Sequence, residues 1–344
     1  MIKSLKLGAA MIAGLVALAA PSWAQQPITL SLADQNSPNS LYEQNGLVPW
    51  AKKVEEATKG KVKIQIYPSQ TLVKGPDMWR AVKSGITDIG WCFHGYWADM
   101  TPLSDVITLP FLPFTTAAQG SEVFSTLIAK YPALQKEFAD VQPLANWTSS
   151  SYILLTARKQ VKTLEDIKGM KIRVTGGPPT DQIKALGAVP MLLPMPDVYD
   201  ALDKGVIDGA AVPWEAIHGF RMYEVAKYYT VVPMSAVYFT LGMNKQKWNS
   251  LPADVKQAIM SVSGKDGGKA LGKGAYDDAE PVVMELVKKG NYEMHRYVLP
   301  PEELARWSKA AGEPIWQDWV KKMEAKGKPE AKELLAAALD LLKK

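Results

Sequence analysis

One phrase occurs twice in this chain of 344 residues, and it constrains the fold. The copies are Val82–Gly90 (VKSGITDIG) and Leu202–Ala210 (LDKGVIDGA), each a helix end, a glycine, a β-branched residue, an aspartate and a short strand. A glycine that ends a helix adopts the left-handed conformation without steric cost. A predicted strand and helix precede each copy, with the strands at Lys61–Tyr67 and Val189–Leu193. The repeat predicts two α/β lobes of similar build, and a small molecule commonly binds between such lobes.

The first two dozen residues have the pattern of an export signal. Two lysines, Lys3 and Lys6, precede an apolar run at Leu7–Ala20, and Ser22–Ala24 is a small–any–small cleavage site. We predict a signal peptide at 1–24, cleaved after about Ala24, and a mature protein in the periplasm. A membrane anchor is the alternative, but the run is short for a bilayer span. No later segment is apolar for long enough, so we do not expect the mature chain to span a membrane.

Cysteine content and charge exclude several classes of protein. Cys92 is the only cysteine, so an internal disulfide is impossible, and we expect this thiol to be buried and inert. The formal net charge of +5 falls to about +3 without Lys3 and Lys6. Lysines and acids alternate along helices, as in Lys52–Glu56, which is typical of solvated faces. No basic patch with interleaved aromatic residues is present, so we expect no nucleic-acid partner.

Strands and helices alternate along the mature chain. The pattern predicts a strand at Ile28–Leu32, a helix at about Ser40–Thr58 and, later, strands near Tyr228–Val232 and Val237–Met243. This order, with short connections, is typical of a mostly parallel sheet. Thr163 and Asp166 have the spacing of a capping box.

Two helical segments follow in the last third. A long helical stretch runs from Leu251-Pro252 to about Lys289 with interruptions at glycines. Within it, Gly267–Gly274 (GGKALGKG) is similar to a phosphate-binding loop, but a glycine replaces its final Ser or Thr and no strand precedes it. We interpret it as a flexible break in the helix. The amphipathic segment Pro329–Lys343 predicts a helix docked on a lobe.

Phrases along most of the mature chain match one family. They are Met78–Gly90, Leu103–Pro113, Thr163–Val174 (TxxDIKGMKIRV), Leu186–Pro190 (LGAVP) and Val198–Gly209. With these phrases the chain resembles the solute-binding proteins, of the DctP type, of tripartite ATP-independent periplasmic (TRAP) transporters.

The resemblance implies an α/β, two-lobed periplasmic-binding-protein fold, with a ligand cleft between the lobes and a long helix that spans both. On this basis we place residues 27–151 and about 237–265 in lobe I, and residues 152–236 and about 266–344 in lobe II. The resemblance also implies that ligand binding closes the lobes, and that the closed form delivers the solute to membrane-embedded transporter subunits.

Arg173 is the strongest candidate for ligand recognition. It ends a predicted strand and precedes a Gly-Gly-Pro-Pro loop, at the edge of the sheet where open α/β folds bind ligands. A guanidinium offers two parallel donors that match a carboxylate. By position alone, a solvated arginine at a strand end is the commoner case. In the family, however, this arginine clamps the ligand carboxylate.

The departures from the family pattern bear on the ligand. A second arginine is usual upstream, and Tyr152 occupies that position here. The family often has Glu-Asn-Pro after the second repeat, whereas this chain has Ala211-Val212-Pro213 followed by Trp214. A second buried carboxylate would lack a partner, which is costly. We therefore expect a monocarboxylate with an apolar or aromatic tail, with a C4-dicarboxylate as the alternative.

The other candidate ligand-binding residues are aromatic or polar and lie near predicted strand ends. Each also has a structural interpretation as a core or turn residue, and a lone histidine is more often structural. We expect Phe93 and Trp97 to be plain packing. The remaining candidates are Gln35, Trp91, His94, Tyr96, Trp147 and Tyr238.

Two other functions remain as alternatives. An exported hydrolase would need a nucleophile with its base, a carboxylate pair or a metal site, and the three histidines (His94, His218 and His295) are scattered. We predict neither enzymatic activity nor a cofactor, and nothing in the sequence requires a metal. A periplasmic ligand-sensing module would use the same closing cleft, and only a neighbouring gene for membrane subunits or for a sensor kinase would separate the two.

Overall fold

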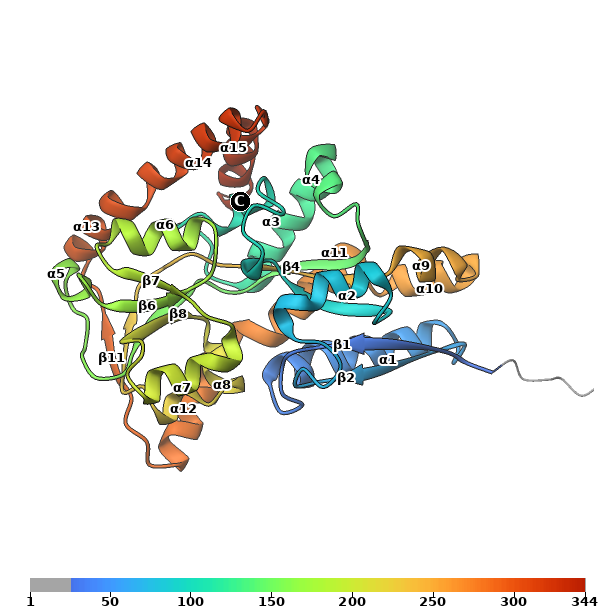
Figure 1. Cartoon of the computed structure of the whole chain (residues 1–344), viewed down its shortest axis with the longest axis horizontal. Helices are drawn as coiled ribbons and strands as arrows, with labels where there is room; N and C mark the ends of the chain where they lie inside the picture. The colour runs from blue at the N-terminus through green and yellow to red at the C-terminus, as the bar shows by residue number, and fades with distance from the viewer. Residues whose placement is uncertain (1–25, 344) are drawn as a thin grey trace, which may run out of the picture.

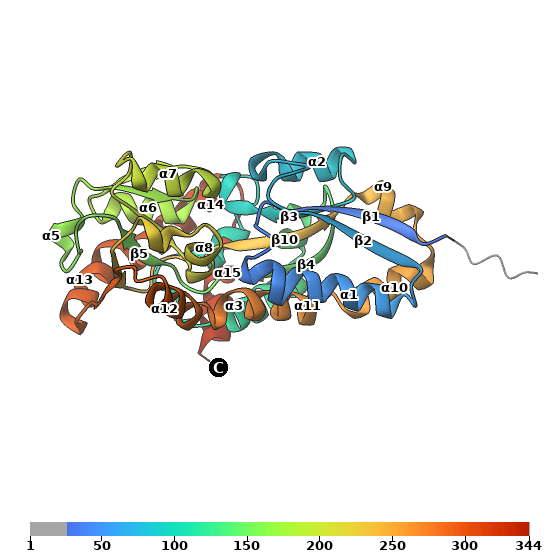
Figure 2. The same cartoon turned by 90° about the horizontal axis from the view of Figure 1, so that it is seen from below.

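The computed structural model describes residues 26–343, so the predicted signal peptide at 1–24 lies outside it. The described chain forms two β-sheets, each with helices around it, in an elongated molecule (Figures 1 and 2). This arrangement confirms the predicted α/β fold class with two similar halves. Within residues 26–343, no helix is both long and apolar enough to cross a membrane.

The two sheets have the same internal order. In space, the first consists of β2 (Val62–Tyr67), β1 (Ile28–Ala33), β3 (Ile89–Phe93), β10 (Tyr238–Met243) and β4 (Gln142–Thr148). The second consists of β7 (Val189–Leu192), β6 (Lys171–Val174), β8 (Gly209–Val212), β5 (Ile153–Thr156), β9 (Tyr228–Val231) and β11 (His295–Val298). In each sheet, the first three strands are parallel and the next two pair antiparallel. Each half is therefore built on the same plan.

The repeated phrase gives the same turn in both halves. Gly85 ends α2 (Met78–Ser84) with φ of 79°, and Gly205 follows α7 (Val198–Asp203) with φ of 70°. In both copies, the amide of the residue after the glycine donates to a helix carbonyl at 2.9 Å. These bonds close the helix end by the left-handed cap that the sequence predicts.

The aspartate of the phrase also has one role in both halves. A carboxylate oxygen of Asp88 accepts from the Ser31 amide of β1 at 2.9 Å, and one of Asp208 accepts from the Lys171 amide of β6 at 2.7 Å. Each aspartate therefore ties the strand that follows it to its parallel neighbour. The carboxyl ends of these strands consequently meet at one edge of each sheet, where ligands bind in open α/β folds.

The chain crosses between the halves more than once. The connection from β4 to β5 and that from β9 to β10 run side by side and form a hydrogen-bonded ribbon. In it, the Ser149 amide donates to Val237 O at 2.9 Å and the Tyr152 amide donates to Ser235 O at 3.2 Å. Strand β10 thus follows the second sheet in sequence but lies in the first (Figure 2).

Short and long helices surround both sheets. Around the first are η1 (a π-helix, Glu43–Leu47), α1 (Val48–Ala57), η2 (Gly75–Asp77), α2, η3 (His94–Tyr96), η4 (Ser104–Thr108), α3 (Ala117–Lys130), α4 (Pro132–Glu137), α9 (Lys245–Ser250), α10 (Ala253–Ser261) and α11 (Gly264–Gly272). Around the second are α5 (Leu164–Ile167), α6 (Pro178–Ala185), η5 (Met195–Asp197), α7, α8 (Trp214–Gly219), η6 (Met222–Glu224) and α12 (Ala279–Lys289).

A long helical stretch spans both halves, as predicted, and one predicted interruption is present at Val262 and Ser263, directly before Gly264. Helix α11 lies on α3 and β4, passes through the π-helix η7 (Lys273–Asp277) into α12, and α12 lies on α8. The segment Gly267–Gly274, which we interpreted as a flexible break, is helical. A Cβ at Gly268 would lie 2.2 Å from Asn146 O, and one at Gly272 would lie 2.6 Å from Ser121 Oγ. These glycines let the helix approach its neighbours closely.

The C-terminal helices join the halves from outside. Helices α13 (Pro301–Ala311) and α14 (Glu313–Ala325) pack on α6, whereas α15 (Ala331–Leu342) packs on α3 and η4. The predicted amphipathic helix is therefore docked as expected. The lobe boundaries stay a prediction, although residues 266–344, assigned to lobe II, include α11 and α15, which contact the first half.

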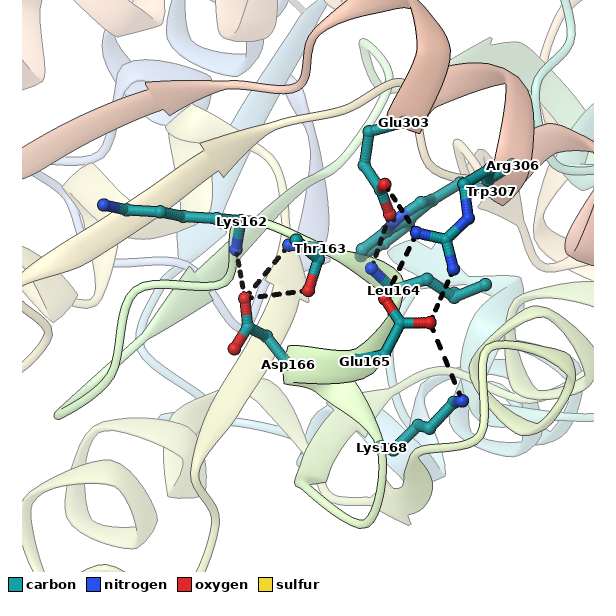
Figure 3. A network of polar contacts seen from close by, with 9 residues as sticks. All are labelled: Lys162, Thr163, Leu164, Glu165, Asp166, Lys168, Glu303, Arg306 and Trp307. Carbon is teal, nitrogen blue, oxygen red and sulfur yellow. Dashed lines mark hydrogen bonds and ion pairs between the residues drawn. The ribbon is translucent and has the colours of Figure 1, made fainter.

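A buried carboxylate anchors α13 to the second half (Figure 3). The predicted capping box at Thr163 and Asp166 is present at the start of α5. Beside it, Glu303 of α13 accepts a hydrogen bond from the Leu164 amide and another from Trp307 Nε1, the latter at 3.1 Å. One carboxylate thus satisfies donors from two elements and fixes the start of the C-terminal helices.

Candidate ligand-binding site

A cavity is enclosed between the strand ends of the two halves. Its free volume is about 20 Å³, room for roughly one water molecule. We name it the inner cavity. Its lining residues are Gln35, Asn36, Trp91, Phe93, Tyr152, Met195, Pro213, Glu215, Ala216, Phe220, Phe239 and Tyr276.

The first half contributes an aromatic wall to the inner cavity. Phe239 of β10 stacks on Phe93 at a centroid distance of 5.2 Å and on Tyr276 at 5.8 Å. Trp91 lies 5.0 Å from the same ring, and Trp147 stacks behind it at 5.4 Å. The rings hold one another in place, so the wall presents fixed aromatic faces and edges.

Arg173 lies at the end of β6, and its side chain is fully buried. Its Nε donates to Leu193 O at 3.1 Å, but within residues 26–343 neither Nη atom has a hydrogen-bond partner. Burial lowers the pKa of Arg173, and the nearby phenols of Tyr152 and Tyr96 offset part of this effect. A buried guanidinium with free donors is costly unless an anion meets it.

Two tyrosines connect Arg173 with the inner cavity. Tyr152 lines the cavity and lies beside the guanidinium. The Tyr96 hydroxyl donates to Gln35 Oε1 at 2.9 Å and accepts from the Met195 amide at 3.0 Å. Tyr96 and Arg173 also border a second cavity, a groove of about 190 Å³ that we name the outer groove. Arg173 therefore stands between the inner cavity and this outer groove.

Three buried carboxyl groups lie on another side of the cavity. Glu215 of α8 lines it, and burial raises the pKa of Glu215 to about 8. Asp34 and Glu43 lie nearby in the first half, and burial also raises the pKa of both. These two carboxyls face each other, so one shared proton satisfies the pair.

The structure places two candidates in the core of the first half. His94 bonds Thr101 Oγ1 at 3.1 Å and Thr240 Oγ1 at 2.8 Å, and burial lowers its pKa to about 3. The Tyr238 hydroxyl contacts Asp105 Oδ1 at 3.2 Å. Since their polar atoms are paired within the core, neither residue is free to meet a ligand, and we correct both assignments to structural roles.

Three further candidates lie one layer from the inner cavity. Val212 and Trp214 are in the core of the second half, where Trp214 meets the edge of Tyr229 at 4.8 Å. Trp147 is fully buried behind the aromatic wall. Pro213 and Glu215, the chain neighbours of Val212 and Trp214, line the cavity instead. The prediction that Val212, Trp214 and Trp147 contact the ligand is therefore corrected. Of the other candidates, Gln35, Trp91 and Tyr152 line the inner cavity, whereas Tyr96 and Arg173 border the outer groove.

Several lining residues were absent from the sequence prediction. Phe93, expected to be plain packing, is part of the aromatic wall, and Phe239 replaces Tyr238 there. Strand alternation shows that one of these two neighbours faces the cleft, but not which one. Glu215 lies in the first turn of α8, where an acidic residue is common and does not indicate a binding site. Met195, Ala216, Phe220 and Tyr276 carried no signal in the sequence.

Other chemistry has little support in the described chain. Between residues 26 and 343, no group of three or more His, Cys, Asp and Glu side chains is placed to hold a metal ion. Cys92 is buried, and burial raises the pKa of its thiol.

The family follows from a match that covers most of the chain. Residues 32–323 match the model of bacterial extracellular solute-binding protein, family 7 (DctP), and the chain belongs to this family. It is a family of solute-binding proteins and not of enzymes.

Known relatives make the class more specific. One solved structure is a TRAP solute binding protein from Rhodoferax ferrireducens in complex with copurified benzoate. It is 28% identical to this chain, with a TM-score of 0.86. The match covers 92% of this chain and 98% of that protein. A marine metagenome TRAP protein specific for aromatic acid ligands, in complex with 3-hydroxybenzoate, has the same identity and coverages and a TM-score of 0.84. The C4-dicarboxylate-binding periplasmic protein DctP of Rhodobacter capsulatus is 26% identical over 85% of this chain and 86% of its own. The chain is a TRAP solute receptor, as the resemblance implied.

Proposed function

We propose that this receptor binds an aromatic monocarboxylate. Its carboxylate pairs with the two Nη atoms of Arg173, and its ring lies against the aromatic wall formed by Trp91, Phe93, Phe239 and Tyr276. The observation that carries the proposal is a fully buried guanidinium whose Nη atoms have no partner within residues 26–343, and which lies beside Tyr152 of the aromatic cavity. A bidentate pair with a carboxylate satisfies both donors.

The charges around the inner cavity favour one carboxylate over two. Arg173 is the only buried lysine or arginine among the described residues. The nearby buried ionisable groups are instead the acids Asp34, Glu43 and Glu215. A second ligand carboxylate would therefore meet acidic groups and no cation, which disfavours a C4-dicarboxylate.

The relatives support an aromatic ligand. Both solved structures described above, each 28% identical, hold an aromatic acid, benzoate in one and 3-hydroxybenzoate in the other. The Rhodobacter relative is named for C4-dicarboxylates, so succinate belongs in any test.

Binding is coupled to closure of the two halves in this proposal. Arg173 comes from the second sheet, whereas most of the aromatic wall comes from the first. A ligand that contacts both binds the closed form more tightly and shifts the population toward it. A cavity of about 20 Å³ is smaller than a benzene ring, so the halves must separate for the ligand to enter. We propose that the closed receptor works in the periplasm and delivers its ligand to membrane-embedded TRAP subunits.

Calorimetry with the mature chain, from Gln25 onward, tests the ligand class. The protein is unfolded and refolded to remove carried-over ligand and then titrated with benzoate, phenylacetate, succinate and glucuronate. We expect binding of the aromatic acids, and a loss of about a hundredfold or more in Arg173→Met, because two charge-assisted hydrogen bonds disappear. Lys171→Met, on the exposed start of the same strand, is the matched control and should bind normally. Binding of succinate alone would overturn the aromatic assignment.

A further inference from the structure

Two residues that line the inner cavity each carry a polar atom without a partner in the described chain. Glu215 Oε1 and Trp91 Nε1 are both buried, and neither has a hydrogen-bond partner anywhere in residues 26–343. Two other polar atoms of lining residues have partners: Gln35 Oε1 accepts from Tyr96, and Asn36 Nδ2 donates to Asp34 at 2.9 Å. Buried polar groups are nearly always paired, so these two require an explanation.

The two atoms have complementary chemistry. An indole Nε1 only donates, whereas a carboxyl oxygen accepts. Trp91 comes from β3 in the first half and Glu215 from α8 in the second. The group that satisfies both must therefore accept one hydrogen bond and donate another across the closed interface. A hydroxyl does both.

Other ligand groups pair only one of the two atoms. A charged ammonium would satisfy Glu215 but would leave the Trp91 donor unpaired. A second carboxylate would accept from Trp91 but has no hydrogen to donate to Glu215 Oε1.

We infer that the ligand is a hydroxylated aromatic monocarboxylate, whose ring hydroxyl accepts from Trp91 Nε1 and donates to Glu215 while its carboxylate pairs with Arg173. This inference rests on the proposed function and makes it more specific. It assigns Glu215 and Trp91 as the residues that select for the hydroxyl.

The test compares matched ligands by calorimetry. The wild-type protein is titrated with benzoate, with 2-, 3- and 4-hydroxybenzoate, and with the corresponding fluorobenzoates, which resemble the hydroxyl in size but cannot donate. We expect at least one hydroxybenzoate to bind about tenfold more tightly than both benzoate and its fluoro analogue, since the hydroxyl pairs two buried groups.

Three variants locate the effect. Trp91→Phe keeps a ring but removes the donor, and Glu215→Leu removes the acceptor. Each should abolish the tenfold preference, measured as the ratio of hydroxybenzoate to benzoate affinity within the same variant, while Glu215→Gln should keep most of it, because an amide still accepts. Benzoate binding itself verifies that each variant is folded.

The outcomes separate the inference from the proposed function. If wild-type protein binds benzoate but no hydroxybenzoate binds more tightly, the inference is overturned and the proposed function stands; a bridging water then pairs the two atoms. Preference that persists in both Trp91→Phe and Glu215→Leu also overturns it. If no aromatic acid binds at all, the proposed function itself fails.

Discussion

Arg173 is held in a position that suits a ligand better than it suits the free protein. Its side chain is fully buried, and within residues 26–343 only Nε has a hydrogen-bond acceptor. Removing a guanidinium from water costs several kcal/mol, and one neutral acceptor offsets little of it. The ligand-free protein is therefore destabilised at the residue to which we assign the ligand carboxylate.

Replacing this charge should stabilise the protein and abolish its function. We expect Arg173→Met to raise the free energy of unfolding of the ligand-free protein by about 1–3 kcal/mol, because a flexible apolar side chain fills the site. Urea denaturation, followed by tryptophan fluorescence, measures the change. Arg158→Met on the exposed surface is the control and should change stability by less than about 0.5 kcal/mol. A loss of stability in Arg173→Met would show that Arg173 serves the fold.

At this scale the sequence predicts residues in motifs and misses their neighbours. Arg173 was predicted because the phrase around it is specific, and its role in ligand binding stays a prediction. Tyr238 was chosen over Phe239 because the face of β10 depends on its pairing with β3 and β4, which are far away in sequence. Trp214 was chosen over Glu215 because an aromatic residue attracts attention, although α8 directs it into the core of the second half.

Helix α11 shows how an element can contradict its own composition. Glycines destabilise an isolated helix by up to about 1 kcal/mol each, so a glycine-rich stretch predicts a break. Here the glycines face β4 and α3, and side chains at Gly268 and Gly272 would collide with atoms of both. Tertiary packing therefore requires the residues that helix propensity disfavours.

A single methyl group in this contact should be costly. We expect Gly268→Ala to lower the free energy of unfolding by about 1–3 kcal/mol or more, because its Cβ would lie 2.2 Å from the backbone oxygen of Asn146. Gly46→Ala is the matched control, since its Cβ would have 3.5 Å to Leu271, an ordinary contact. Chemical denaturation compares the two. Equal effects would mean that helix propensity, and not the close contact, decides.

Elements were predictable where the signal is local. The repeat fixed two helix ends and two strands, because a glycine cap and an aspartate act within a few residues. The antiparallel insertion of β10 into the first sheet has no local signal, since it depends on where the chain returns.

The whole molecule carries a buried acidic layer between its halves. Asp34 and Glu43 belong to the first half and Glu215 to the second, and burial raises the pKa of all three. A carboxyl with a raised pKa in the folded state binds its proton where the unfolded chain has released it. Stability is therefore lost as the pH rises from the unfolded value to the folded value.

This layer predicts a melting temperature that falls with pH. For Glu215 the window runs from its ordinary pKa of 4.5 to about 8, so we expect the ligand-free protein to melt at a higher temperature at pH 5 than at pH 8.5. Differential scanning calorimetry measures the slope. Glu215→Gln, which mimics the protonated acid, should reduce it. If the melting temperature of Glu215→Gln depends on pH as steeply as that of the wild-type protein, other groups cause the pH dependence.

The hydrogen-bonded ribbon between the halves limits how the molecule can move. If the two halves were joined by a single strand, they could rotate about three axes. A ribbon of two hydrogen-bonded strands resists twist and shear, and it bends easily only perpendicular to its plane. The helical connection through η7 runs between the halves as a third link. Opening therefore has close to one degree of freedom, and a single distance between one probe on each half is enough to follow it.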